Sequence, residues 1–217
     1  LGNSHAYIAG SSGYGKSHLL EKVIGTSLIS EGVVPLFFDF VGELASDEPE
    51  GFEIINAADG FDMNPLRLEP KDNKYGRPMV QVYQLASLFK NALGLGEQQE
   101  NKAKEAISNA YGDLGISIKA KLASEPSSWP TFEELWQYIQ NDSDERFVAR
   151  MKPVFEWDVF NGTAGSFSSL LAKPTIVDFK ELCEAGESLA NVVSQILVRG
   201  IFNHLVSGKS TVGVKYV

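Results

Sequence analysis

The sequence contains little cysteine and no long apolar run. Cys183 is the single cysteine among 217 residues, so no internal disulfide can form, and this excludes the disulfide-stapled secreted domains. No stretch approaches the roughly 18 consecutive apolar residues that a membrane-spanning helix needs. The histidines at 5, 18 and 204 are scattered without the spacing of metal ligands. These absences predict a cytoplasmic protein with no membrane span and no histidine-based metal site.

Positive charge is also scarce. The chain has 19 lysines and arginines against 28 aspartates and glutamates, which gives a net charge of −9. Such a chain as a whole repels the phosphates of nucleic acids, so DNA could meet only a local basic lining such as a pore loop. Lys71, Lys74 and Arg77 are the candidates for such a loop, with an ordinary solvated loop as the alternative.

A complete phosphate-binding loop is present near the start of the chain. The pattern G-x-x-x-x-G-K-[ST] is matched by Gly10, Ser11, Ser12, Gly13, Tyr14, Gly15, Lys16 and Ser17. Glycines let the backbone N–H groups face the phosphates, while the lysine reaches the β- and γ-phosphates and the serine hydroxyl binds Mg²⁺. The preceding residues 5–10 are typical of a buried strand, and apolar residues recur at helical spacing over 16–30. We therefore expect a bound nucleotide with Mg²⁺, and His18 on the helix surface beside the nucleotide.

A second apolar run, residues 33–44, contains an acid at the end of its most apolar part. The run predicts a strand buried on both faces of a parallel sheet, with Asp39 at the carboxyl end, where such sheets bind phosphates. Three interpretations stay open for Asp39: a Walker B acid that holds Mg²⁺ through water, a second-strand acid that assists hydrolysis, or a solvated cap of the following loop. Residues 39–42 also match the D-x-x-G of GTPases, but no N-K-x-D guanine-recognition sequence follows. ATP is therefore favoured over GTP.

In their order and spacing, these motifs resemble the HerA/FtsK superfamily of ring-forming P-loop ATPases, which has relatives in conjugation and secretion. The turn from Asp39 to Glu43 is similar to the Asp-Pro-x-Gly-Glu turn of that family, with Phe40 in place of the common proline. An apolar segment at 52–57, an Asn-Pro turn within 60–68 and the block 173–205 follow in the family's order. The portion 94–116 is similar to the HerA-type ATPases of bacterial DNA-restriction systems, of the DptH type, and of conjugation systems. The resemblance implies that Lys16, Asp39 and Glu43 are catalytic, with the two acids polarising or ordering the attacking water.

The resemblance also implies an α/β fold: a RecA-like P-loop NTPase with a parallel sheet flanked by helices and an inserted all-helical lobe. We expect residues 1–76 to begin the ATPase core, residues 77–172 to form the lobe, and residues 173–217 to continue the core. Amphipathic helices are predicted from the residues themselves over 77–116, with a break at 94–96, and over 131–139 and 144–155. A long scaffold helix is predicted over 187–206 by an apolar stripe of Leu189, Val192, Val193, Ile196, Leu197, Ile201 and Leu205. We expect the chain to be part of a longer protein, with the Walker B acids and the arginine finger beyond Val217.

Three functions fit this sequence better than a fourth, a small-molecule kinase with the helical insertion as its lid, in which the block 173–205 has no natural place. The first is a Mg²⁺-ATP-driven DNA translocase or helicase that acts in genome processing, phage defence or DNA transfer. The resemblance implies that it assembles into a ring, a hexamer, and that a nuclease or other effector is its partner. The second is a secretion or conjugation ATPase that powers protein export or pilus assembly. The third is a nucleotide-binding module that does not hydrolyse ATP. The sequence favours the first.

Overall fold

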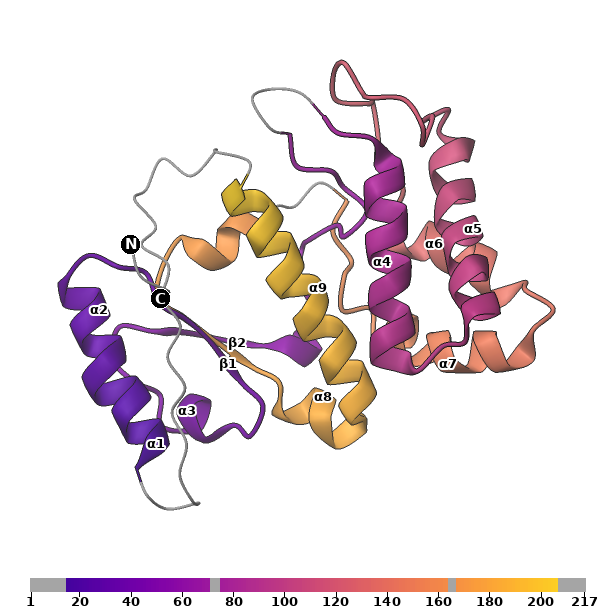
Figure 1. The fold of residues 1–217 in the computed structure, drawn as a ribbon. Helices are drawn as coiled ribbons and strands as arrows, with labels where there is room; N and C mark the ends of the chain where they lie inside the picture. Colours follow the sequence, from indigo (N-terminus) through magenta and orange to yellow (C-terminus); the bar gives the residue numbers. More distant parts are fainter. Residues whose placement is uncertain (1–14, 71–74, 164–166, 207–217) are drawn as a thin grey trace.

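The computed structural model describes residues 15–70, 75–163 and 167–206 (Figure 1). The strand expected at 5–10, the loop residues 10–14 and the strand expected at 212–217 lie outside these ranges. The sheet of the described residues has three parallel strands in the order β1-β3-β2, with β1 Leu36–Asp39, β2 Glu53–Asn56 and β3 Thr175–Asp178. The α/β class and the parallel sheet flanked by helices are confirmed.

Burial differs between the central strand and its neighbours. In β3, Thr175, Ile176 and Val177 are fully buried, and β3 lies between the two other strands. In β1, Leu36, Phe37 and Phe38 are only half-buried, and within the described ranges β1 has a paired strand on one side only. The expectation of a strand buried on both faces was therefore wrong for β1, and it is β3 that has this environment.

The helix expected at 16–30 forms one continuous helical segment. It consists of α1 Lys16–His18, a π-helical stretch Leu19–Gly25 and α2 Thr26–Ser30. The segment passes close to the sheet at its middle glycine: a Cβ atom on Gly25 would lie 3.0 Å from Cζ of Phe52 and 3.3 Å from Cε2 of Phe37. The missing side chain therefore allows the close packing of this helix on the two stacked phenylalanine rings.

The strands of the sheet each end in a residue whose side chain begins the next turn. Asp39 accepts the backbone N–H of Gly42, Asn56 that of Ala58, and Asp178 that of Lys180. Asp and Asn are favoured at such positions because their short side chains reach backbone donors two or three residues ahead. The register pairs Asp178 with both Asp39 and Asn56, so the three turns start side by side at one edge of the sheet.

Short helices follow these turns: α3 Glu43–Ser46 after β1, the 3₁₀ turn η2 Ala57–Asp59 after β2, and α8 Lys180–Ala185 after β3. Another 3₁₀ turn, η3 Phe167–Leu171, precedes β3. The long helix α9 Glu187–Val206 has the expected bounds. Its predicted apolar stripe is buried except for half-buried Leu205, which confirms the scaffold interpretation.

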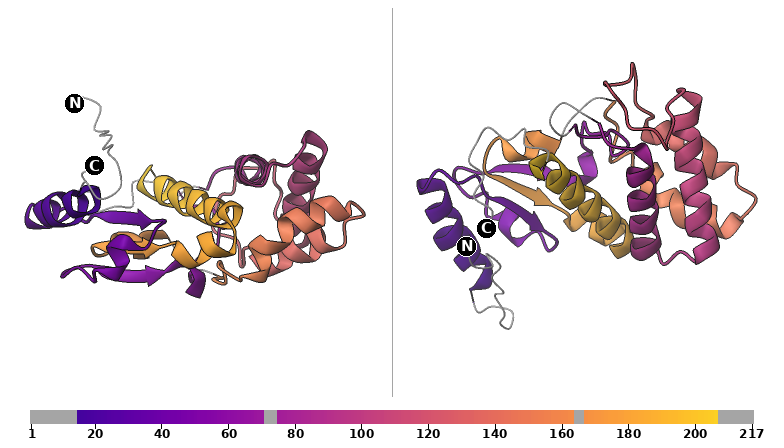
Figure 2. Two further views of the ribbon diagram at one scale, coloured as in Figure 1. Left: turned by 90° about the horizontal axis from the view of Figure 1, so that it is seen from below. Right: turned by 45° about the horizontal axis from the view of Figure 1, so that its top comes forward.

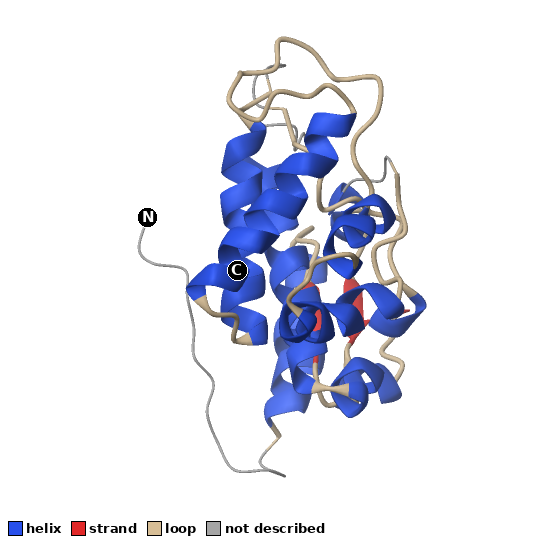
Figure 3. Ribbon diagram, turned by 90° about the vertical axis from the view of Figure 1, so that its right-hand side faces the viewer, coloured by secondary structure: helices blue, strands red, loops and turns tan. Residues whose placement is uncertain are grey.

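A group of four helices fills the middle of the chain, as the sequence predicted. They are α4 Pro78–Leu93, α5 Glu97–Asp113, α6 Phe132–Gln140 and α7 Glu145–Glu156. Figure 1 shows them on one side of the molecule, the sheet on the other side, and α9 between the two. Seen from the helical side, the helices stand in front of the strands (Figure 3). Since α4 packs directly on α9, one hydrophobic core runs from the sheet into the helical group.

A buried asparagine and a buried tryptophan stabilise the helical group and its contact with the rest of the core. Asn64, 1% exposed, accepts the N–H of Leu66 and donates to the carbonyls of Pro130 and Thr163, which confirms the expected Asn-Pro turn. Trp129 is buried beside the rings of Tyr75 and Tyr111, and therefore belongs to the core.

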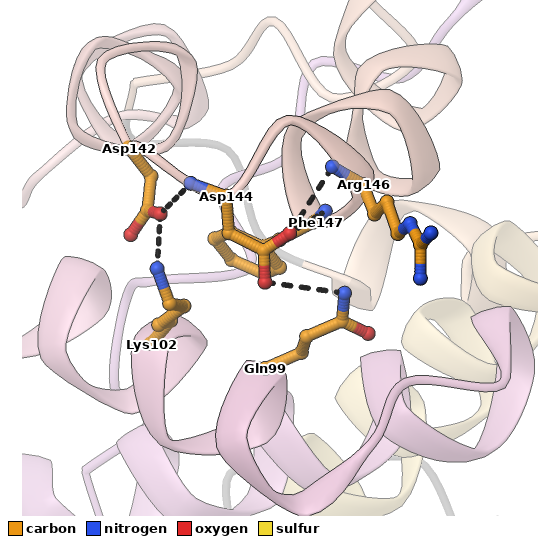
Figure 4. A network of polar contacts seen from close by, with 6 residues as sticks. All are labelled: Gln99, Lys102, Asp142, Asp144, Arg146 and Phe147. Carbon is orange, nitrogen blue, oxygen red and sulfur yellow. Dashed lines mark hydrogen bonds and ion pairs between the residues drawn. The ribbon is translucent and has the colours of Figure 1, made fainter.

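A polar network holds α5 against the connection between α6 and α7 (Figure 4). Lys102 forms an ion pair with Asp142, whose carboxylate also accepts the N–H of Asp144 at 2.7 Å. Asp144 caps α7 by accepting the N–H groups of Arg146 and Phe147, each at 3.1 Å. The Phe147 N–H bond is the main cause of the lowered pKa of the Asp144 carboxyl.

Within the described part of the chain, no helix has the length and apolar character needed to cross a membrane.

Candidate functional site

The turn after β1 is organised by the buried carboxylate of Asp39. This side chain is 6% exposed, and its Oδ1 accepts the N–H groups of Val41 at 3.2 Å and Gly42 at 2.9 Å. Its Oδ2 accepts the N–H of Ala45 at 3.0 Å, in the first turn of α3. Asp39 is thus a cap, as one of the three interpretations held, but a buried cap rather than a solvated one. Both of its oxygens already bind backbone donors.

Gly42 makes the tight turn between Asp39 and α3 possible. Its φ of 82° lies in the left-handed region, which side-chain-bearing residues rarely adopt. A Cβ atom at this position would lie 2.8 Å from Cδ of Lys180, so the aliphatic stem of that lysine packs directly on the glycine. The turn therefore depends on glycine for its conformation and for its packing, and it presents Glu43 as the first residue of α3.

Glu43 contacts a residue of the phosphate-loop motif. The hydroxyl of Ser17 donates to Oε2 of Glu43 over 2.7 Å, although the two residues are 26 positions apart in the sequence. Figure 1 shows the reason, since α1 and α3 lie next to each other at the same edge of the sheet. The Mg²⁺ ligand and one of the catalytic acids expected from the sequence are therefore in direct contact.

The rest of the phosphate-loop motif is described only in part. Gly15 has a φ of 76°, and Lys16 begins α1, so the lysine and serine are at the N-terminal end of the helical segment 16–30. The partial positive charge of a helix N-terminus favours a phosphate at this end. Gly10, Ser11, Ser12, Gly13 and Tyr14 lie outside the described residues, and their cradle of N–H groups stays a prediction.

The hydroxyl oxygen of Ser17 fits the cation that the motif implies, and the carboxylate of Glu43 lies beside it. A hydroxyl is a hard oxygen donor, which Mg²⁺ prefers. Within residues 15–70, 75–163 and 167–206, no group of three or more His, Cys, Asp or Glu side chains could hold a metal alone. Mg²⁺ commonly takes one or two protein oxygens and completes its shell with phosphate and water, so this small donor set suits a metal that arrives with a nucleotide.

Other residues singled out from the sequence lie away from this contact or outside the described ranges. His18 is exposed, as expected for the helix surface. Burial raises the pKa of the half-buried Cys183 thiol, which makes it a poor nucleophile. Arg77 is exposed before α4, whereas Lys71 and Lys74 lie outside the described residues.

Comparison with known proteins gives a match among solved structures. No protein-family model matches the sequence, and no curated protein matches it significantly. Among solved structures, VirB4 of Thermoanaerobacter pseudethanolicus superposes with a TM-score of 0.64 at 18% sequence identity. The chain shares the fold of VirB4. The match covers 90% of this chain and 55% of the VirB4 chain, so the described architecture corresponds to about half of that protein. The likeness to VirB4 does not single out the HerA/FtsK superfamily, which stays a prediction from the motifs.

Sequence reasoning did not single out Lys180. The sequence signal that could have identified Lys180 is its position two residues after Asp178, the acid that ends an apolar strand. Val41 has the same position relative to Asp39. Only the parallel register of β1 and β3 brings its side chain over Gly42, since it aligns Asp178 with Asp39.

Proposed function

We propose that this chain is the nucleotide-binding part of a Mg²⁺-ATP-driven motor of the conjugation or secretion type. The contact between Ser17 and Glu43 carries the proposal, because it joins the phosphate loop to the turn after β1 in one site. The fold supports the motor type, since VirB4 is a conjugation ATPase of the P-loop class. This order of preference differs from that of the sequence, which placed DNA translocation first.

Lys16 and Ser17 are proposed to bind the triphosphate. The ammonium group of Lys16 would neutralise the β- and γ-phosphates, and the backbone of residues 10–15 would direct N–H groups at them. The Ser17 hydroxyl would hold Mg²⁺, which when bound offsets the negative charge of the phosphate oxygens. These residues bind and position the nucleotide, and such positioning accounts for most of the catalysis in phosphoryl transfer.

Glu43 is proposed to order the water that attacks the γ-phosphate and to accept a hydrogen bond from it. Its carboxylate already lies against Ser17, so it is on the phosphate side of α3. Asp39 is a positioning residue in this proposal, because its carboxylate binds the turn that carries Glu43. The two acids thus have different roles, although the resemblance assigned both to the water.

The experiment measures nucleotide binding and hydrolysis separately, with the full-length protein. Lys16→Ala should weaken Mg²⁺-ATP binding in calorimetry by about tenfold or more, since it removes a charged phosphate contact. Glu43→Gln should leave binding within about threefold and lower the hydrolysis rate by roughly 10² or more, as expected when a water-ordering carboxylate is lost. Glu50→Gln is the matched control, because Glu50 is an exposed glutamate outside the site. Normal hydrolysis by the Glu43 variant would rule out its role, and normal binding by the Lys16 variant would rule out the site.

A second measurement separates the two kinds of motor. A conjugation or secretion ATPase should hydrolyse ATP at a rate that added DNA leaves unchanged, and should copurify with a membrane complex. Strong stimulation by DNA that is lost in Lys16→Ala would instead favour the DNA translocase with its effector partner. Assembly into a ring, which both motors require, can be followed by sedimentation with and without nucleotide.

A further inference from the structure

A cavity of about 230 Å³ lies where α4 meets α9. Figure 2 shows these two helices side by side. The cavity is separate from the Ser17–Glu43 site, and none of its lining residues belongs to that site. Its volume is below the roughly 300 Å³ at which pockets for drug-sized molecules begin, so a ligand here would be small.

The charge of this cavity is opposite to that of the chain. Three arginines from three segments line it: Arg67 after the Asn-Pro turn, Arg77 before α4 and Arg199 in α9. Among the described residues, Glu69 is the one acid in the lining, and its Oε2 lies 3.7 Å from Nδ1 of His204. A cationic cavity is unexpected in a protein with a net charge of −9, and it therefore points to an anionic ligand.

Among the described residues, two of the three arginines have no carboxylate partner. Arg67 forms an ion pair with Glu125 at 3.1 Å. Within the described ranges, no carboxylate lies at ion-pair distance from Arg77 or Arg199. The cavity therefore has two positive charges that the described protein does not balance with an ion pair.

The charge of Arg199 is partly removed from water without a counter-charge among the described residues. It is half-buried, and Nε donates to the neutral amide oxygen of Gln84 at 3.1 Å. Burial lowers the pKa of the Arg199 guanidinium. A buried cation without a counter-charge is unfavourable, and an anion in the cavity would offset the lost hydration.

The remaining wall of the cavity is mostly apolar. Leu85 and Leu88 of α4, Ile196 of α9 and Phe167 of η3 line it. A ligand that fills this space thus needs an apolar or aromatic body as well as an anionic group. The two unbalanced arginines match the dianion of a phosphate monoester better than the single charge of a carboxylate, and guanidinium groups bind phosphate oxygens in pairs.

We propose that the cavity between α4 and α9 binds a small organic phosphate monoester, with its phosphate on Arg77 and Arg199 and its apolar body against Leu85, Leu88 and Ile196. The ligand would lie between the helical group and the helix that follows the sheet. Its binding would stabilise the contact between these two parts of the molecule. The site goes beyond the proposed ATPase function and does not depend on it.

The test is calorimetric titration with phenyl phosphate, inorganic phosphate and benzoate at constant ionic strength. All titrations use the Lys16→Ala variant, so that phosphate binding at the phosphate loop does not contribute to the measured heat. The result for the cavity can then be interpreted even if the nucleotide proposal fails. Phenyl phosphate should bind more tightly than either inorganic phosphate or benzoate. Benzoate binding as tightly as phenyl phosphate would overturn the proposal.

Substitutions in the same background locate the site. Arg77→Met and Arg199→Met should each weaken phenyl phosphate binding by about tenfold or more, the loss expected for a charged hydrogen-bonding contact. Arg146→Met is the matched control, because Arg146 is an exposed arginine on α7 outside the cavity. If Arg199→Met fails to fold by circular dichroism, the exposed Arg77 decides the matter. Unchanged affinity in Arg77→Met would overturn the proposal.

Discussion

Replacing Asp39 by alanine should destabilise the turn that carries Glu43. The alanine removes the acceptor for the N–H groups of Val41, Gly42 and Ala45. The bonds to Gly42 and Ala45 are buried, and each contributes about 1.5 kcal/mol when the acceptor is charged. The bond to Val41 is longer and partly exposed, so it adds little. We expect Asp39→Ala to lower the free energy of unfolding by about 3 kcal/mol.

Asparagine at the same position separates structure from catalysis. Asp39→Asn keeps Oδ1 for Val41 and Gly42, but turns an amide nitrogen toward the N–H of Ala45. The expected loss is therefore about half as large, near 1.5 kcal/mol. Since Asp39 is a positioning residue here, the asparagine variant should still bind Mg²⁺-ATP.

Urea unfolding followed by far-ultraviolet circular dichroism measures both losses, provided that the slope of free energy against urea stays constant. The reasoning is refuted if Asp39→Ala is within about 0.5 kcal/mol of the unsubstituted protein, the range of ordinary surface substitutions. It is refuted equally if Asp39→Asn abolishes Mg²⁺-ATP binding without loss of stability, because that is the behaviour of a metal-binding acid.

Two further predictions concern the helical group. Asn64→Ala should cost about 2–4 kcal/mol, because it leaves the buried N–H of Leu66 and two carbonyls without their partner; a urea midpoint equal to that of the unsubstituted protein would contradict this. Asp144→Asn should destabilise the protein at pH 7, and the difference should shrink toward about pH 3, since a carboxyl with a lowered pKa contributes stability above its unfolded value near 3.9 and loses it as the pH falls through the folded value. A difference that is constant between pH 3 and 7, measured by urea unfolding, would show that the charge of Asp144 is irrelevant.

Much of the secondary structure could be predicted because its signals are local. The apolar stripe of α9 repeats at the helical period, and the glycines at 94 and 96 separate α4 from α5 as expected. The end of β1 was also predicted, since Asp39 after a short apolar run starts a turn. The predicted burial of β1 was wrong because burial depends on what packs against a strand in the folded chain, and the apolar runs of β1 and β3 look alike.

The sequence by itself determined the phosphate-loop motif, the alternation of strands and helices, and the acid at the end of β1. These follow from residue types at short spacing, where backbone conformation and periodicity act. Tertiary structure alone decided that Glu43 contacts Ser17, that Asp39 is occupied by backbone N–H groups, and that three arginines from distant segments line one cavity. Such contacts depend on strand register and helix packing, which bring together residues that no local pattern relates.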